Sequence, residues 1–133
     1  MAMIQSKRVY EAVTDNDGQR VLVDRLWPRG ISKADLSDVN WCKEVAPSDA
    51  LRKQFHQHPD TFTEFRQGYR QELAAHPEYW QQLLVIAARE TLTLLYAAKD
   101  TEQNNAVVLA EFLEDELDRR GDSSSPVCYA DER

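Results

Sequence analysis

The sequence predicts a small layered α/β domain in which helices flank a short, mostly parallel sheet. Two apolar runs, over residues 19–24 and 91–97, indicate buried strands, because a short apolar run bounded by turn residues is typical of a strand covered on both faces. Segments with helical periodicity lie between these runs, and strands joined through helices pair in parallel with right-handed crossovers. The chain has 133 residues, the usual length of one domain, and we place that domain at residues 1–120.

Further strands are predicted on either side of this pattern. Residues 3–10 contain the β-branched and aromatic side chains of a first strand, and turn residues at 14–18 separate it from the next. A fourth strand has room to lie between Leu36 and Val45. From Gly121 onward the periodicity is lost, and we expect residues 121–133 to form a disordered tail.

Four helices are predicted from caps and from apolar residues spaced three and four apart. Ser48 is the expected N-cap of a short helix that ends near His56. A second helix starts near Pro59, a third opens at Pro77, and a long fourth runs from about residue 103 to about residue 119. The apolar stripes of the last three helices are Phe62, Phe65, Tyr69 and Leu73; Trp80, Leu83, Leu84 and Ala87; and Ala106, Leu109, Ala110, Leu113 and Leu117.

The chain is acidic, but its charge is unevenly distributed. The formal net charge is −7, with residues 1–55 at +1 and residues 56–133 at −8. An acidic protein without a basic stripe is a poor ligand for nucleic acid, so we expect no general DNA or RNA binding. Arg66 and Arg70, four residues apart, and the acidic residues of the last helix are expected to face solvent. Those acidic residues are Glu111, Glu114, Asp115, Glu116 and Asp118.

No segment indicates a membrane or secreted protein. The longest apolar runs are far shorter than the ~20 residues of a membrane span, and the N-terminus lacks the apolar region of a signal peptide. Cys42 and Cys128 lie far apart, which fits reduced thiols, with Cys42 as a small apolar residue. We therefore expect a cytoplasmic monomer or homodimer without a membrane partner. No glycine-rich phosphate loop is present, and the cofactor stays unknown.

Two polar loops follow the two buried strands. One is the segment from Asp24 to Gly30, and the other runs from Ala98 through Asp100 to Asn105. In open α/β sheets, ligands bind beyond the carboxyl ends of the strands. If the two strands are parallel neighbours, both loops meet at one edge, and we place the candidate site there.

The residue types in these loops favour an anionic ligand. Arginine presents a planar fork to phosphate or carboxylate, lysine adds a point charge, and a helix N-terminus offers free N–H groups. An indole ring can stack on a base, and a carboxylate can accept a proton. The predicted ligand-binding residues are Arg25, Trp27, Arg29, Lys99 and Asn104, and the predicted catalytic residues are Asp24 and Asp100.

A purely structural interpretation of the same residues stays open. Asp24 and Arg25 can pair with each other, and Trp27 can plug the core. Lys99 and Asp100 also fit an ordinary strand-to-helix turn, with Asn104 as a helix N-cap. The segment from His56 to Asp60 has two histidines but no accompanying metal motif, and we predict no metal site.

The chain resembles the YeaO-like family of uncharacterised bacterial proteins (domain-of-unknown-function family 488). The resemblance covers about residues 3–117 and rests on RVLVDRLWPRG, KEVAPSDALRKQF, FRQGYRQEL and TLLYAAKDTEQNNAVVLAEFL. It implies no reaction. A more distant branch resembles this chain in a loop with aspartate and proline after a strand, which here corresponds to Asp24 and Pro28.

Two functions remain open, and whether the chain is an enzyme is undecided. The first is binding of, or action on, a small anionic ligand of nucleotide or phosphate type at the loops after the central strands. The alternative is a non-catalytic protein-interaction or regulatory module, with residues 26–28 as a recognition patch. A third possibility, nucleic-acid binding through the basic groups of residues 7–33, is disfavoured by the net charge.

Overall fold

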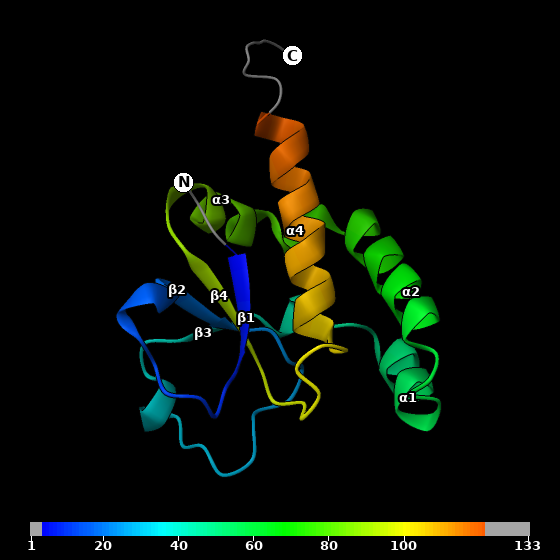
Figure 1. Ribbon diagram of the computed structural model, residues 1–133, viewed down its shortest axis with the longest axis horizontal. Coiled ribbons are helices and arrows are strands. Elements are labelled where there is room, and N and C mark those ends of the chain that lie inside the picture. Colours follow the sequence, from blue (N-terminus) through cyan, green and yellow to red (C-terminus); the bar gives the residue numbers. More distant parts are fainter. Residues whose placement is uncertain (1–3, 122–133) are drawn as a thin grey trace.

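A single sheet of four parallel strands forms the centre of the molecule. The computed structural model describes residues 4–121, and the strands lie in the order β1-β4-β2-β3 (Figure 1). This arrangement confirms the predicted α/β fold and parallel pairing, and the fourth strand does lie between Leu36 and Val45. The strands are β1 (Ile4–Arg8), β2 (Gln19–Leu22), β3 (Asn40–Trp41) and β4 (Leu92–Tyr96).

Strand β4 is central because it pairs with β1 on one side and β2 on the other. All five of its residues are buried. Thr93 stands opposite Gln5 in β1 and opposite Arg20 in β2, so these three side chains form one row across the sheet. The predicted continuous apolar run is therefore the middle of the sheet, where both faces are covered.

Local sequence accounts for the helices that follow β3 and β4. Ser48 is the N-cap of the first, since its hydroxyl accepts a hydrogen bond from the Leu51 amide. Two predicted starts are shifted, because a separate 3-10 turn over Pro77–Tyr79 precedes α3 and because α2 begins after Thr61 rather than at Pro59. The helices are α1 (Asp49–Gln57), α2 (Phe62–Ala75), α3 (Gln81–Arg89) and α4 (Asn105–Gly121).

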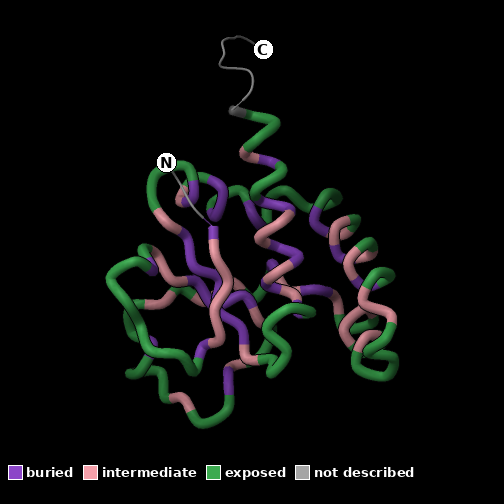
Figure 2. Tube along the Cα trace, viewed as in Figure 1, coloured by how far each residue is buried: buried purple, intermediate pink, exposed green. Residues whose placement is uncertain are grey.

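The core divides into two clusters on the two faces of the sheet. The larger joins Val21, Leu92 and Leu94 to the predicted helix stripes, including Tyr69 and Leu109. The smaller contains Val9, Leu22, Leu36 and Leu95, against which Trp27, Ile31, Val39, Trp41 and Ala97 pack. No described residue of α1–α4 belongs to this smaller cluster. Helices therefore cover one face, and the loop after β2 covers the other (Figure 2).

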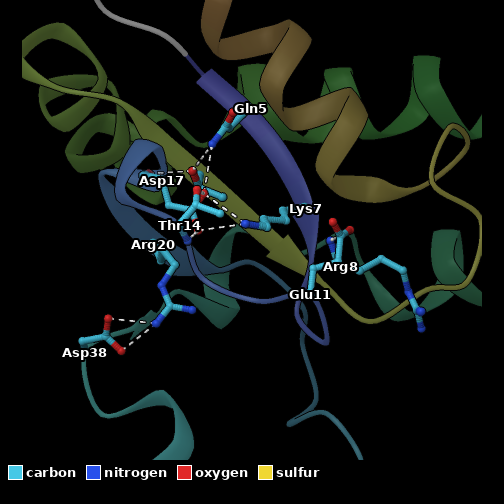
Figure 3. A network of polar contacts seen from close by, with 9 residues as sticks. Gln5, Lys7, Arg8, Glu11, Thr14, Asp17, Arg20 and Asp38 are labelled. Carbon is cyan, nitrogen blue, oxygen red and sulfur yellow. Dashed lines mark hydrogen bonds and ion pairs between the residues drawn. The ribbon is translucent and has the colours of Figure 1, made fainter.

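A buried polar network ties the loop after β1 to the helix-free face (Figure 3). Asp17 is buried, and both its carboxylate oxygens lie 3.1 Å from the Lys7 ammonium. It also accepts hydrogen bonds from the Thr14 amide and hydroxyl, while its carbonyl accepts one from Thr93. Burial alone would raise the pKa of Asp17, but the hydrogen bonds from Thr14 and Lys7 hold it below its ordinary value.

The prediction for the exposed faces of α2 and α4 was partly wrong. Glu116 is buried and pairs with Arg119 and Arg120. Arg66 and Arg70 are not simply solvated, because both form ion pairs with Glu111 and Arg70 also reaches Asp115 at 2.6 Å. The reason is tertiary, since α2 packs against α4 and brings the two charged rows together.

Gly121 is the one residue of the predicted tail that the structure describes. Helix α4 includes Gly121, where the tail was predicted to begin, and the rest of the predicted disordered tail lies outside the described residues. Within residues 4–121, no helix combines the length and apolarity needed to cross a membrane.

Candidate functional site

The loops after β2 and β4 meet at the carboxyl edge of the sheet, as predicted from parallel neighbours. One Asp24 carboxylate oxygen accepts a hydrogen bond from the Ala97 amide at 2.9 Å. The other accepts one from the Asn105 side-chain amide at 3.1 Å. Asn105 is the first residue of α4, so Asp24 joins the ends of two strands to the start of a helix. In Figure 1 the loops and the beginning of α4 gather below the sheet.

The environment of Asp24 shifts its acidity. Burial raises the pKa of Asp24 above its ordinary value, and the Ala97 and Asn105 hydrogen bonds and the charge of Arg52 only partly oppose this effect. The Asp24 carbonyl also accepts a hydrogen bond from the Trp41 indole at 2.8 Å. The Ala97 and Asn105 donors thus already engage both oxygens of the Asp24 carboxylate.

Arg25 faces α1 rather than Asp24. Its Nε lies 3.0 Å from Asp49 Oδ1, and Arg52 Nη2 lies 2.8 Å from the same oxygen. The hydrogen bond from Arg52, followed by the charge of Arg25, lowers the pKa of Asp49. Arg52 Nε is buried and has no hydrogen-bond partner among the described residues. Two guanidinium groups therefore share one carboxylate oxygen, and one buried donor is left over.

Tyr10 contacts two of the basic residues at this edge. The Tyr10 hydroxyl donates to the Arg29 carbonyl at 2.9 Å, and the Arg8 guanidinium lies over the Tyr10 ring at 5.0 Å from its centroid. Arg8 also donates to the carbonyls of Ala97 and Ala98, immediately before the exposed Lys99. The end of β1 and the loops after β2 and β4 thus bring Arg8, Arg29 and Lys99 to one edge.

The Trp27 side chain is held by contacts within the protein. Its indole donates to the Ile31 carbonyl at 2.6 Å and meets Trp41 edge-on at 5.3 Å between ring centroids. Pro28 is buried beside it, and Gly30 has a φ of +77°, the left-handed region that favours glycine. The turn from Trp27 to Ile31 therefore packs over the helix-free face, as the structural interpretation allowed.

Asp100 and Asn104 shape the entry to α4. Asp100 accepts hydrogen bonds from the Glu102 and Gln103 amides, which lower its pKa. Asn104 is buried; its amide donates to the Asp100 carbonyl, and its oxygen accepts from the Val107 amide. Asn104 is therefore in contact with its own loop and helix, whereas Asn105 contacts Asp24.

The structure thus brings the segments of the predicted site together, but with different partners. All the predicted roles stay predictions. These are catalysis by Asp24 and Asp100, and ligand binding by Arg25, Trp27, Arg29, Lys99 and Asn104. Sequence reasoning missed Arg8 and Arg52. The signal for Arg52 was present in its spacing of three residues from Asp49 on a predicted helix. No comparable local signal marked Arg8, which reads as an ordinary strand residue.

Open hollows lie along α4, and the described residues form no metal-type cluster. Two open hollows of about 490 Å³ each lie along α4, one against α3 and one beside Arg70. In the part of the chain that the structure describes, histidine, cysteine and acidic side chains nowhere gather in a group of three suited to a metal ion.

This fold and edge define a small parallel α/β protein with basic loops at the carboxyl ends of its strands. A family model described as "Inactive DUF488-N3 subclade" matches residues 3–130. The chain belongs to the DUF488 family.

Two relatives with similar sequences are named as uncharacterised proteins. The "Uncharacterized protein YeaO" of Escherichia coli (strain K12) is 52% identical over 110 residues, which cover 83% of this chain and 96% of that protein. The "Uncharacterized protein Rv3073c" of Mycobacterium tuberculosis (strain ATCC 25618 / H37Rv) is 41% identical over 110 residues, covering 83% of this chain and 92% of that protein. No solved structure matches.

Proposed function

We propose that the chain binds a small anionic ligand at the carboxyl edge of its sheet and does so without catalysing a reaction. The observation on which this proposal rests is the buried Arg52 Nε, which has no acceptor among the described residues. A buried donor without a partner is costly, and in native proteins it commonly marks the place of an ion, water or ligand. Arg25 lies beside it and shares the Asp49 oxygen.

Other basic residues at the carboxyl edge support the same proposal. Arg8 ends β1, and Arg29 and Lys99 lie on the loops after β2 and β4, in a chain whose net charge is negative. Arginine forks are the side chains best suited to hold phosphate or carboxylate oxygens. Local positive charge on an acidic protein also attracts small anions selectively to one place.

The engagement of both aspartates favours binding over catalysis. Asp24 uses one lone pair of each carboxylate oxygen to accept from Ala97 and Asn105, and these contacts join two strand ends to the start of α4. Asp100 accepts from two backbone amides, and its lowered pKa makes it a weak base. The family description "Inactive" agrees with a protein that retains a binding edge without a reaction.

Calorimetry and thermal shift with a panel of anions at fixed ionic strength test this proposal. A ligand at 100 times its dissociation constant should add about 2.7 kcal/mol to the free energy of unfolding. Arg25→Gln and Arg52→Gln should each weaken binding about tenfold or more, because each removes a charge-assisted hydrogen bond.

Arg89→Gln is the matched control, because Arg89 is exposed at the end of α3 and near the amino end of β4, on the opposite edge. Binding that survives both site substitutions, or that falls equally in the control, would contradict an anion site at Arg25 and Arg52. A circular dichroism spectrum of each variant separates lost binding from lost folding.

A protein-contact surface is the second candidate, and exposed apolar side chains favour it. Leu26, on the loop after β2, is 66% exposed, and Val13, on the loop after β1, is 58% exposed. Within the 26–28 patch only Leu26 is available for contact, because Trp27 is half-buried and Pro28 is buried. If a partner bound the Leu26→Ser variant as tightly as it binds the wild type, this surface would be excluded.

A further inference from the structure

Arg25 and Arg52 share one acceptor. Both guanidinium groups contact Asp49 Oδ1, at 3.0 Å and 2.8 Å, and Arg52 Nε stays without an acceptor. Three donors are involved: Arg25 Nε, Arg52 Nη2 and Arg52 Nε. They belong to two separate side chains, whereas a carboxylate has two oxygens in one plane. Asp49 therefore satisfies this pair incompletely.

The neighbouring carboxylates do not supply the missing acceptor. Asp24 is committed to Ala97 and Asn105, although the charge of Arg52 is felt at its carboxyl group. Glu72, on α2, accepts from the amide and the hydroxyl of Ser48 at 3.0 Å and 2.6 Å. The donor without a partner is therefore a feature of the arginine pair itself.

Asp49 is free to leave this position. Its side chain is exposed, and the start of α1 does not depend on it. Ser48 caps the Leu51 amide, and Glu72 takes the Ser48 amide. Rotation of Asp49 into water would release both guanidinium groups without unwinding the helix.

We infer that the Arg25–Arg52 pair selects a phosphate monoester over a carboxylate, and that Asp49 is a tethered competitor which the phosphate displaces. This inference rests on the proposed anion-binding function. A free carboxylate offers the same group that Asp49 already presents at high local concentration, so it gains little by exchange. A phosphate monoester brings three terminal oxygens and a charge of about −1.5 to −2, enough for one acceptor at each of the three donors.

Calorimetry with inorganic phosphate, glycerol phosphate and acetate at constant ionic strength tests the inference on the full-length chain. The wild type should bind both phosphates and show no measurable acetate binding. Asp49→Asn removes the competing charge, so phosphate should bind about five- to tenfold tighter and acetate binding should become measurable. Asp60→Asn, which removes an exposed carboxylate from the loop before α2, is the control and should change neither.

A second variant tests the geometry rather than the charge. In the Asp49→Asn protein, Arg52→Lys keeps the positive charge but removes Nε and the planar fork. The preference for phosphate over acetate should then shrink at least about threefold, since one of the three directed donors is lost.

The possible failures are distinguishable. Equal affinity of phosphate and acetate for the wild type, or unchanged affinities in Asp49→Asn, would overturn the selection by Asp49 and leave anion binding standing. An unchanged preference after Arg52→Lys would overturn the role of the third donor. Absence of binding by every anion, to the wild type and to Asp49→Asn alike, would overturn both the inference and the proposed function.

Discussion

Asp24 accepts a hydrogen bond from Asn105, 81 positions further along the chain, and this contact joins the end of β2 to the first residue of α4. Its other oxygen accepts from the Ala97 amide just beyond β4. One side chain thus holds three elements at the edge where the candidate site lies.

We expect Asp24→Ala to lower the free energy of unfolding by about 1–3 kcal/mol, because it leaves the Ala97 amide without its acceptor. Asp24→Asn should cost less, since an amide oxygen can still accept from Ala97. Urea denaturation of the two variants measures both values, with Asp60→Asn as the exposed control. Equal stability of Asp24→Ala and the wild type would mean that this contact does not hold the edge together.

The pH dependence of Asp24 has a definite sign. Because burial raises the pKa of Asp24 in the folded state, its contribution to stability is complete below the ordinary pKa of 3.8 and is lost as the pH rises through the folded value. The wild type should therefore lose stability relative to Asp24→Asn as the pH rises from 3.8 through the folded pKa of Asp24. Urea titrations at several pH values measure this difference, and a constant difference would contradict the raised pKa.

The stabilisation from the buried ion pair of Lys7 and Asp17 should depend on pH in the opposite sense. The folded pKa of Asp17 is lowered, so its stabilisation is present above the ordinary value of 3.8 and is lost as the pH falls through the folded value. Lys7→Met leaves a buried carboxylate without its cation and should cost about 3 kcal/mol at neutral pH. That cost should shrink in acid; Lys33→Met, at an exposed position, should cost almost nothing at any pH.

Two glycines with positive φ should respond differently to alanine. A Cβ on Gly18 would lie 2.2 Å from the Thr91 carbonyl oxygen, whereas one on Gly30 would meet nothing within 4 Å. Gly30→Ala should therefore cost about 1–2 kcal/mol, from the left-handed backbone alone. Gly18→Ala adds a backbone clash and should cost at least about 3 kcal/mol. Thermal unfolding of both variants gives the order, and equal costs would contradict the close approach at Thr91.

Glu72 should stabilise α1 from a neighbouring helix. Because it accepts from both the amide and the hydroxyl of Ser48, Glu72→Ala should cost about 1–2 kcal/mol. Glu64→Ala, at an exposed position in the first turn of α2, is the control. A double-mutant cycle with Ser48→Ala measures the coupling; strictly additive costs would show that the two residues act independently.

Local signals in the sequence were sufficient for the main strands and helices and for the meeting of the two loops. The apolar runs of β2 and β4 and the spacing of Phe65 and Tyr69 follow from burial on one face, which repeats at a fixed period along the chain. Ser48 was recognisable because a cap acts on residues directly after it. That the loops after β2 and β4 meet followed from parallel pairing alone.

The partners of each site residue were decided only by the tertiary structure. The sheet order places β4 between β1 and β2, and this order brings Arg8 to the loop after β4 and Asn105, instead of Asn104, to Asp24. Packing of α1 at the edge brings Arg52 beside Arg25. Periodicity reports which face of an element is buried, but it has no information on which distant element covers that face. Contacts between side chains far apart in the chain are set by the packing of whole elements. The sequence by itself therefore determined the scaffold and its edge. The tertiary structure decided which side chains contact one another at that edge.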